Sequence, residues 1–312
     1  MPDSSDIEAL TPRQKRELLA RLLNSKPAPE YPDLNLAPPS NLTFKVAETR
    51  QELESAFRIL HDAYVSMGFM RPSPSGMRIT IFNALPGTHT MIALWDGEAI
   101  GTMSIIQDSP MGFPIERVYR IDRLRAENVP LGEISAFAVK KTYRGDWNMI
   151  LFPLIKFAYE YCSRHLGIER ILMLTHPKRS EFHERILFCR RISAQVIDEC
   201  EYVNGAPAVG FYLDIREFLE MCHARHGKEV SAHVATSLTN FVFPARTEVP
   251  SPPSMDPEAI DYFFNQKTDL LSKLSDGDRG ILMSLYKDDR YRDILSRAQD
   301  KQKHSRQGQD ER

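Results

Sequence analysis

Hydrophobic positions in the middle of the chain follow two spacings, which separate predicted strands from predicted helices. Arg50–Val65 has apolar residues three and four positions apart and predicts an amphipathic helix. Leu42–Ala47, just before it, is strand-like. Two further strand-like runs, Thr88–Trp95 and Glu98–Gln107, are joined by Asp96-Gly97, the strongest short signal for a hairpin turn.

After the hairpin, strand and helix candidates alternate. They are a strand around Glu133, a long helix at Asn148–His165, a strand at Ile168–His176, a short helix at Ser180–Leu187, and strands at Arg190–Asp198 and Pro207–Ile215. This order predicts an α/β (α+β) fold in which a mixed central sheet carries helices on both faces.

Helical extensions flank this domain. We divide the chain into an N-terminal helix and proline-rich linker (1–41), the α/β domain (42–227), a helical C-terminal extension (228–300) and a disordered tail (301–312). The N-terminal helix is expected at Thr11–Leu23. The C-terminal helices are expected at Ile260–Leu274 and Asp278–Leu295, with Asp276-Gly277 stopping the first and Asp278 capping the second.

Composition narrows the function classes. The 312 residues are 42% hydrophobic, which is typical of a globular protein, and 40 basic against 42 acidic side chains give no electrostatic reason to expect a nucleic-acid partner. The four cysteines form no C-x-x-C pair and no zinc spacing, so we expect no metal site. The acidic, polar N-terminus and the lack of a run of about 18 apolar residues predict no transmembrane segment and a cytoplasmic protein.

One acid in an apolar strand is the most informative feature. The stretch LGEISAFAV, residues 131–139, contains Glu133, and burying a carboxylate costs several kcal/mol unless it is paired or used. Strand alternation would place Ser135 and Phe137 on the same face, in surroundings that raise the pKa of Glu133 and make it a better base. We expect Glu133 to be a catalytic base or substrate anchor, with Ser135 and Phe137 beside the substrate. The alternatives are a structural acid tied to an arginine, or an acid that reaches solvent at the end of the strand.

Several motifs follow one another in a recognisable order. They are RILHDAYVSMGFM, EISAFAV, KTYRGDW with LFPLIKFAYEY, THPKRSEFHERILF and YVNGAPAVGFYLDI. Over about residues 42–219 they resemble the GNAT superfamily of acyl-CoA N-acyltransferases, in the branch of N-acyl amino acid synthases and the related acyl-homoserine-lactone synthases. The resemblance implies a GNAT-like acyltransferase fold and transfer of a fatty acyl chain from a thioester to an amine.

Three positions depart from the pattern of these relatives and bear on the donor. Ala136 stands where they have arginine, His183 where many have tyrosine, and Arg144-Gly145 is followed by Asp146 and Trp147 instead of a second glycine. Glycine-rich loops at helix starts bind pyrophosphate through converging backbone N–H groups. The anionic side chain of Asp146 and the bulky side chain of Trp147 would impair such binding. The sequence therefore favours the phosphopantetheine of an acyl carrier protein over acyl-CoA as donor, with no permanently bound cofactor.

Four more residues are candidates for the site. Neutral His176 or His183 could accept the amine proton or donate one to the leaving sulfur, although a lone histidine is more often a plain hydrogen-bonding residue. Arg144 could hold a pantetheine phosphate or the carboxylate of the amino acid, and Arg78 could do so from the other side. A surface ion pair is the alternative for each arginine.

The sequence leaves three functions open. The first is an N-acyl amino acid synthase whose partners are an acyl carrier protein and an amino acid. The second is an acyl-homoserine-lactone synthase, which must also bind S-adenosylmethionine. The third is a non-catalytic protein that keeps the fold and binds a carrier protein or a lipid.

Overall fold

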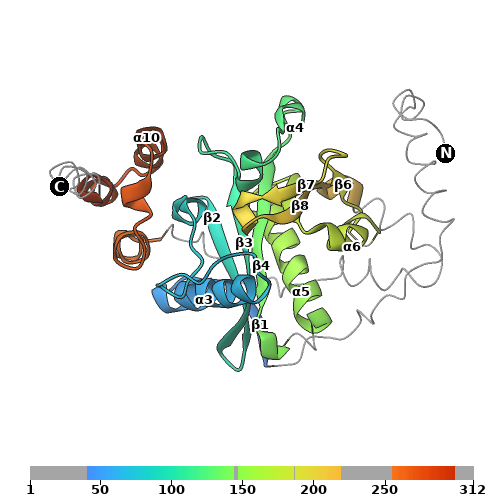
Figure 1. Ribbon diagram of the computed structural model, residues 1–312, viewed down its shortest axis with the longest axis horizontal. Helices are drawn as coiled ribbons and strands as arrows, with labels where there is room; N and C mark the ends of the chain where they lie inside the picture. Colours follow the sequence, from blue (N-terminus) through green and yellow to red (C-terminus); the bar gives the residue numbers. More distant parts are fainter. Residues whose placement is uncertain (1–40, 144–146, 186, 219–254, 299–312) are drawn as a thin grey trace.

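The computed structural model describes residues 41–143, 147–185, 187–218 and 255–298 (Figure 1). The helix expected at Thr11–Leu23 and the tail expected at 301–312 lie outside the described residues.

A mixed sheet organises the described residues, as the pattern predicts. Its strands are β1 (Leu42–Val46), β2 (Thr88–Trp95), β3 (Glu98–Gln107), β4 (Leu131–Val139), β5 (Arg170–Thr175), β6 (Arg190–Arg191), β7 (Ile197–Cys200) and β8 (Ala206–Asp214). They lie in the order β1-β2-β3-β4-β5-β8-β6, and β7 also pairs with β8. The pair β4 and β5 is parallel, and the other pairs are antiparallel.

Helices cover both faces of the sheet (Figure 1). The α-helices are α3 (Arg50–Ser66), α4 (Asp122–Ala126), α5 (Trp147–Glu160), α6 (Ser180–Arg185), α9 (Pro257–Asp261) and α10 (Asp276–Leu285). The 3₁₀ turns are η1 (Ile81–Ala84), η2 (Pro114–Arg117), η3 (Lys141–Tyr143), η5 (Pro177–Arg179), η6 (Glu201–Val203) and η8 (Leu271–Lys273), and the π turns are η4 (Tyr161–His165) and η7 (Tyr262–Gln266). Helix α3 packs on one face with the C-terminal helices, and α5 packs on the other.

The elements that were predicted best have strong signals in neighbouring residues of the sequence. Asp96 and Gly97 both have positive φ, as a two-residue hairpin turn requires, and the strands on either side have the predicted bounds. Helix α3 begins after a capping box, in which the Thr49 side chain accepts from the Glu52 N–H and Glu52 reaches back to the Thr49 N–H.

Two predictions outside the sheet centre are wrong. The strand expected at Arg190–Asp198 is two short pieces, β6 and β7, because most of the segment between them makes no ladder with β8. The helix expected at Ile260–Leu274 is broken into α9, η7 and η8.

The second C-terminal helix also differs from its prediction. Ser275, whose Oγ accepts from the Asp278 N–H at 3.1 Å, caps α10, so Asp276-Gly277 opens this helix instead of ending the previous one. The helix ends before Tyr286, whose backbone is extended, and residues 289–298 form a separate helix.

The C-terminal helices share one hydrophobic core with the sheet and α3. The Phe263 ring is fully buried and meets the Phe57 ring of α3 edge to face, with centroids 5.2 Å apart. The Tyr286 hydroxyl donates to the Ala84 carbonyl, and buried Arg279 donates to the carbonyls of Leu271 and Leu295 at 2.8 and 2.7 Å. These contacts make the C-terminal segment part of the folded domain.

A β-bulge in β4 decides which side chains face α3. Ser135 lies opposite Ser104 and Ala138 opposite Thr102, so two residues of β4, Ala136 and Phe137, stand against the single Met103 of β3. Ala136 takes a left-handed conformation, with φ of 57°. The extra residue turns the Phe137 side chain toward the α5 face. The prediction that Phe137 shares a face with Glu133 and Ser135 is therefore wrong, because strict alternation fails at the bulge.

We expect Phe263→Ala to lower the free energy of unfolding by about 3–5 kcal/mol, because it empties a fully buried aromatic position. Urea denaturation would measure the change. Gly280→Ala is the matched variant in the same segment: Gly280 is exposed inside α10 with open space around its Cβ, so alanine should add about 0.5–1 kcal/mol. A Phe263→Ala protein as stable as the parent would show that the C-terminal helices are not part of the core.

Candidate active site

The two central parallel strands separate along their length, and this opening defines the candidate site. β4 pairs with β5 only from Leu131 to Ile134 on one side and Arg170 to Met173 on the other. Beyond this level β4 continues on β3 and β5 continues on β8. Residues 134–137 of β4 and residues 174–175 of β5 become partly exposed at this same level. An extended group can therefore enter the sheet between the two strands.

Glu133 lies at the inner end of this opening. Its side chain is 1% exposed, and its Oε2 accepts a hydrogen bond of 2.9 Å from the Ile115 backbone N–H. Burial raises the pKa of this carboxyl to about 8; the Ile115 N–H acts against the rise and the charge of Glu116 adds to it. Within the described residues the hydrogen-bond partner of this carboxyl is a backbone amide, so the alternative of a structural acid tied to an arginine is not observed there. A carboxyl with this pKa can take up and release a proton near neutral pH.

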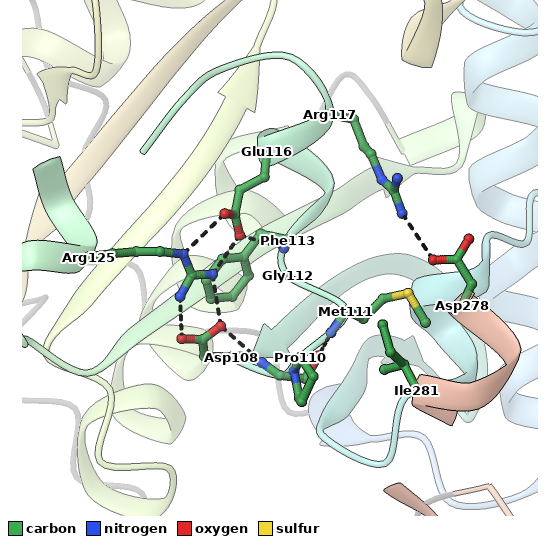
Figure 2. A pocket seen from close by; sticks show the side chains of 11 residues that line it. Asp108, Pro110, Met111, Gly112, Phe113, Glu116, Arg117, Arg125, Asp278 and Ile281 are labelled. Carbon is green, nitrogen blue, oxygen red and sulfur yellow. Dashed lines mark hydrogen bonds and ion pairs between the residues drawn. The ribbon is translucent and has the colours of Figure 1, made fainter. Parts of the chain in front are cut away.

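A polar pocket of about 680 Å³ lies between the loop after β3, the turn η2 and helix α10 (Figure 2). Its charged groups are paired with one another. Arg125 donates to both carboxylate oxygens of Asp108 at 2.7 and 3.0 Å and to Glu116 at 2.6 and 3.1 Å, while Arg117 faces Asp278 at 3.9 Å. This network holds the turn η2 in place, and η2 supplies the Ile115 N–H to Glu133.

Arg78 is held between two aromatic rings. Its guanidinium carbon lies 4.4 Å from the centroid of the Tyr64 ring and 5.1 Å from that of Tyr202. Its one hydrogen bond from the guanidinium in the described part of the chain runs from Nη2 to the Tyr202 carbonyl at 3.4 Å, and no described carboxylate forms an ion pair with it. The predicted surface ion pair is therefore absent there, and the cation remains able to bind an anion.

Tyr202 connects Arg78 to β4, and sequence analysis missed it. The Ser135 side chain interacts with its hydroxyl, and the charges of Arg78 and Glu133 both act on it. Tyr202 is in the turn η6, 124 positions from Arg78, so no local pattern indicates that the two meet. The dipeptide Asn204-Gly205 is a turn signal in the sequence, but it does not indicate that the turn contacts Arg78.

His176 borders the same group of side chains. Its ring stacks on Phe69 at 6.0 Å between centroids, and Phe69 in turn contacts Tyr64 edge to face. Its Nδ1 accepts from the Lys178 N–H at 3.1 Å, so it caps the turn η5. Partial burial, and then the charges of Lys178 and Arg179, lower its pKa, which favours the neutral ring. The structure therefore brings Glu133, Ser135, Arg78 and His176 to one region.

His183 and Phe137 lie on the opposite face of the sheet. The His183 ring stacks on Phe211 at 5.4 Å, in the core beneath α5, and its Nδ1–H donates to the Arg179 carbonyl at 2.8 Å. Glu133 pairs across the strands with Ile106 and Leu172, which belong to the core beneath α3. Burial lowers the pKa of His183. The sheet thus separates His183 from Glu133.

The remaining expectations concern residues or groups that the structure describes only in part. Arg144 lies outside the described residues. Among the residues that are described, no group of three or more metal-binding side chains occurs, and no helix is long and apolar enough to cross a membrane. Cys162 and Cys189 are buried, and burial raises the pKa of both thiols, so neither is an available nucleophile in this part of the chain.

The site combines three chemical features. A slot between β4 and β5 can receive an extended donor, a protonatable carboxyl lies at its inner end, and a guanidinium on the same side can receive an anion. This arrangement suits transfer from a donor in the slot to an acceptor that has both a proton to lose and a negative charge.

We expect Glu133→Gln to change how stability depends on pH. The folded-state pKa of Glu133 is raised from 4.5 to about 8, so wild type loses stability as pH rises through this window, where only the unfolded chain is ionised. Glutamine can still accept from the Ile115 N–H but cannot ionise. Between pH 5 and pH 8 the free energy of unfolding of the variant should therefore rise relative to that of wild type, by about 1.4 kcal/mol per unit of pKa difference. Parallel stability curves from chemical denaturation at several pH values would contradict the raised pKa.

Comparison with known proteins gives a family. The model of the family described as N-acyl amino acid synthase FeeM matches residues 55–214, just over half of the chain. A search of curated proteins gave no match.

Solved structures also show likenesses. FeeM, an N-acyl amino acid synthase from uncultured soil microbes, is 22% identical, with a TM-score of 0.49 over 57% of this chain and 94% of that one. The AHL synthase LasI is 14% identical, with a TM-score of 0.41 over 56% of this chain and 90% of its own. An acyl-CoA N-acyltransferase from Pseudomonas aeruginosa is 14% identical, with a TM-score of 0.38 over 55% and 99%. Because these identities and scores are low, we draw the family from the family model alone.

Proposed function

Because the chain belongs to the FeeM family of N-acyl amino acid synthases and is an acyltransferase, we propose that it moves a fatty acyl chain from an acyl carrier protein thioester to the amine of an amino acid. The observation that carries the proposal is the buried carboxyl of Glu133 at the inner end of the slot between β4 and β5, together with the Arg78 guanidinium, which has no ion pair within the described residues and reaches the same tyrosine, Tyr202.

Arg78 is the group that receives the carboxylate of the amino acid. An amino acid brings one amine and one carboxylate, and Arg78 offers a charge-assisted contact without an ion pair to break within the described residues. The rings of Tyr64 and Tyr202 hold the guanidinium in place. Binding the carboxylate there leaves the amine free to approach the donor from the face of Glu133.

The pantetheine arm of the donor occupies the slot. Its thioester then lies beside residues 134–137 of β4, where that strand has left β5. A carrier protein is favoured over coenzyme A by the bulky and anionic residues that follow Arg144-Gly145 in the sequence. Asp146 lies outside the described residues, so this preference rests on sequence.

Glu133 removes the proton that the amine must lose. The amine nitrogen attacks the thioester carbonyl carbon, a C–N bond forms and the proton passes to the carboxylate. Collapse of the tetrahedral intermediate breaks the C–S bond, and the leaving thiolate takes up a proton, which restores Glu133. A base with a pKa near 8 suits this cycle, because it accepts and releases a proton at similar ease near neutral pH.

The direct test is incubation of the purified full chain with acylated carrier protein and the twenty amino acids, followed by mass spectrometry. We expect an amide product with one amino acid or a small group of them. The same acyl group on coenzyme A should react more slowly at equal concentration. A lactone formed only when S-adenosylmethionine is added would support the homoserine-lactone alternative, and carrier binding without turnover would support a binding protein.

Replacement of the base should act on kcat. Glu133→Gln should lower kcat by about 10²–10⁴-fold, and wild-type activity should rise with pH through a group with a pKa near 8. His183→Gln, on the other face of the sheet, is the control and should keep the wild-type kcat. Initial rates between pH 6 and 9 measure both effects, and an unchanged kcat in Glu133→Gln would refute the role of this residue.

Replacement of the carboxylate receptor should act on KM. Arg78→Ala should raise the KM for the amino acid by about 10–100-fold, since hydrogen bonds to charged groups contribute about 1.5–3 kcal/mol. The KM for the acyl donor should stay the same. Arg71→Ala, an exposed arginine in the same loop, serves as the control for charge alone. Equal effects of the two substitutions would argue against a specific carboxylate site at Arg78.

A further inference from the structure

Tyr202 is fixed in the site by two contacts that reach across the molecule. Its carbonyl accepts from Arg78 Nη2 at 3.4 Å, and the neighbouring Asn204 donates from Nδ2 to the Gly68 carbonyl at 3.0 Å. The turn η6 is therefore tied to the segment between α3 and η1. The Tyr202 ring lies against the Arg78 guanidinium, which leaves little freedom for its position.

The Tyr202 hydroxyl points to the place where β4 leaves β5. It lies close enough to the Ser135 side chain to interact with it, and Ser135 directly follows Ile134, the last residue of β4 that pairs with β5. Ser135 and Glu133 share one face of β4. The phenol carries a proton that it can donate to a substrate oxygen, with the Ser135 hydroxyl as its neighbour.

The hydroxyl stays protonated at every pH at which Glu133 can act as a base. Burial raises the pKa of Tyr202 to about 12, and the charge of Glu133 adds to the rise, whereas Arg78 and the interaction with the Ser135 side chain oppose it. Two neighbouring groups are thus suited to opposite tasks: the carboxyl accepts a proton and the phenol keeps one.

Resting on the function proposed above, we propose that the Tyr202 hydroxyl is a catalytic group, which donates a hydrogen bond to the carbonyl oxygen of the thioester as that oxygen becomes an oxyanion. Attack by the amine moves the electron pair of the C=O bond onto the oxygen. Collapse returns the pair and expels the thiolate. Tyr202 keeps its proton throughout, so Glu133 alone transfers protons in the cycle. A donor held in place before the reaction stabilises the intermediate more than the substrate.

The matched substitution is Tyr202→Phe, which removes the hydroxyl and keeps the ring against Arg78. We expect kcat to fall by about 10²-fold, as for the loss of one oxyanion donor, with an unchanged KM for the amino acid. The pH dependence set by Glu133 should be retained. Tyr212→Phe, which removes a hydroxyl from a β8 tyrosine whose ring packs on Arg170, is the control and should leave kcat unchanged.

Binding of an intermediate analogue separates this role from a structural one. A phosphonamidate that joins an alkyl chain to the amino acid carries an anionic oxygen where the intermediate has its oxyanion. Tyr202→Phe should weaken its binding by the same factor as kcat/KM falls, while binding of the amide product stays constant. Thermal melting of both proteins confirms that the variant is folded.

The outcomes distinguish this inference from the function on which it rests. A wild-type protein that forms no amide refutes the proposed function. Wild-type activity combined with an unchanged kcat in Tyr202→Phe refutes the role of the hydroxyl alone. Equal weakening of analogue and product binding would also refute it, because such a result indicates a general loss of packing.

Discussion

The separation of β4 from β5 is the constraint on which the rest of the site depends. Parallel pairing of the two strands stops after Ile134, and the bulge at Ala136 keeps β4 in register with β3 on its other side. A left-handed alanine costs about 1 kcal/mol or more, which the pairing with β3 on both sides of the bulge offsets. The opening can persist because each of the two strands keeps a full partner on its outer side.

Burial of Glu133 follows from the same arrangement. The carboxyl sits where the two strands still touch, and the N–H of Ile115 is the polar contact that makes its burial tolerable. That N–H is held in place by η2, which Arg125 ties to Glu116 and Asp108. The C-terminal helices support η2 and the core around it. Asp278 of α10 faces Arg117 at the end of η2, and Phe263 packs against Phe57 in the core beneath α3. A raised pKa at one carboxyl is therefore a property of several packed segments.

Sequence predicted the elements with strong local signals and failed where distant packing decides. The hairpin at Asp96-Gly97 and the helix at Arg50–Val65 are indicated by neighbouring residues, and the structure confirms both. Phe137 was placed on the wrong face because a bulge depends on how two strands align, which no alternation pattern contains. The C-terminal helices are shorter than predicted, because they are interrupted where the chain packs against α3 and η1.

The sequence by itself determined the order of strands and helices, the family and the acid in the β4 strand, because periodicity, turn residues and motif order are properties of neighbouring positions. Only the tertiary structure decided which candidates meet. It joined Glu133, Ser135, Arg78 and His176 through Tyr64, Phe69 and Tyr202, and it placed His183 across the sheet. Side chains more than a hundred positions apart are brought together because they border a common hydrophobic core. The free energy gained by burying that core is contributed by residues of the whole domain.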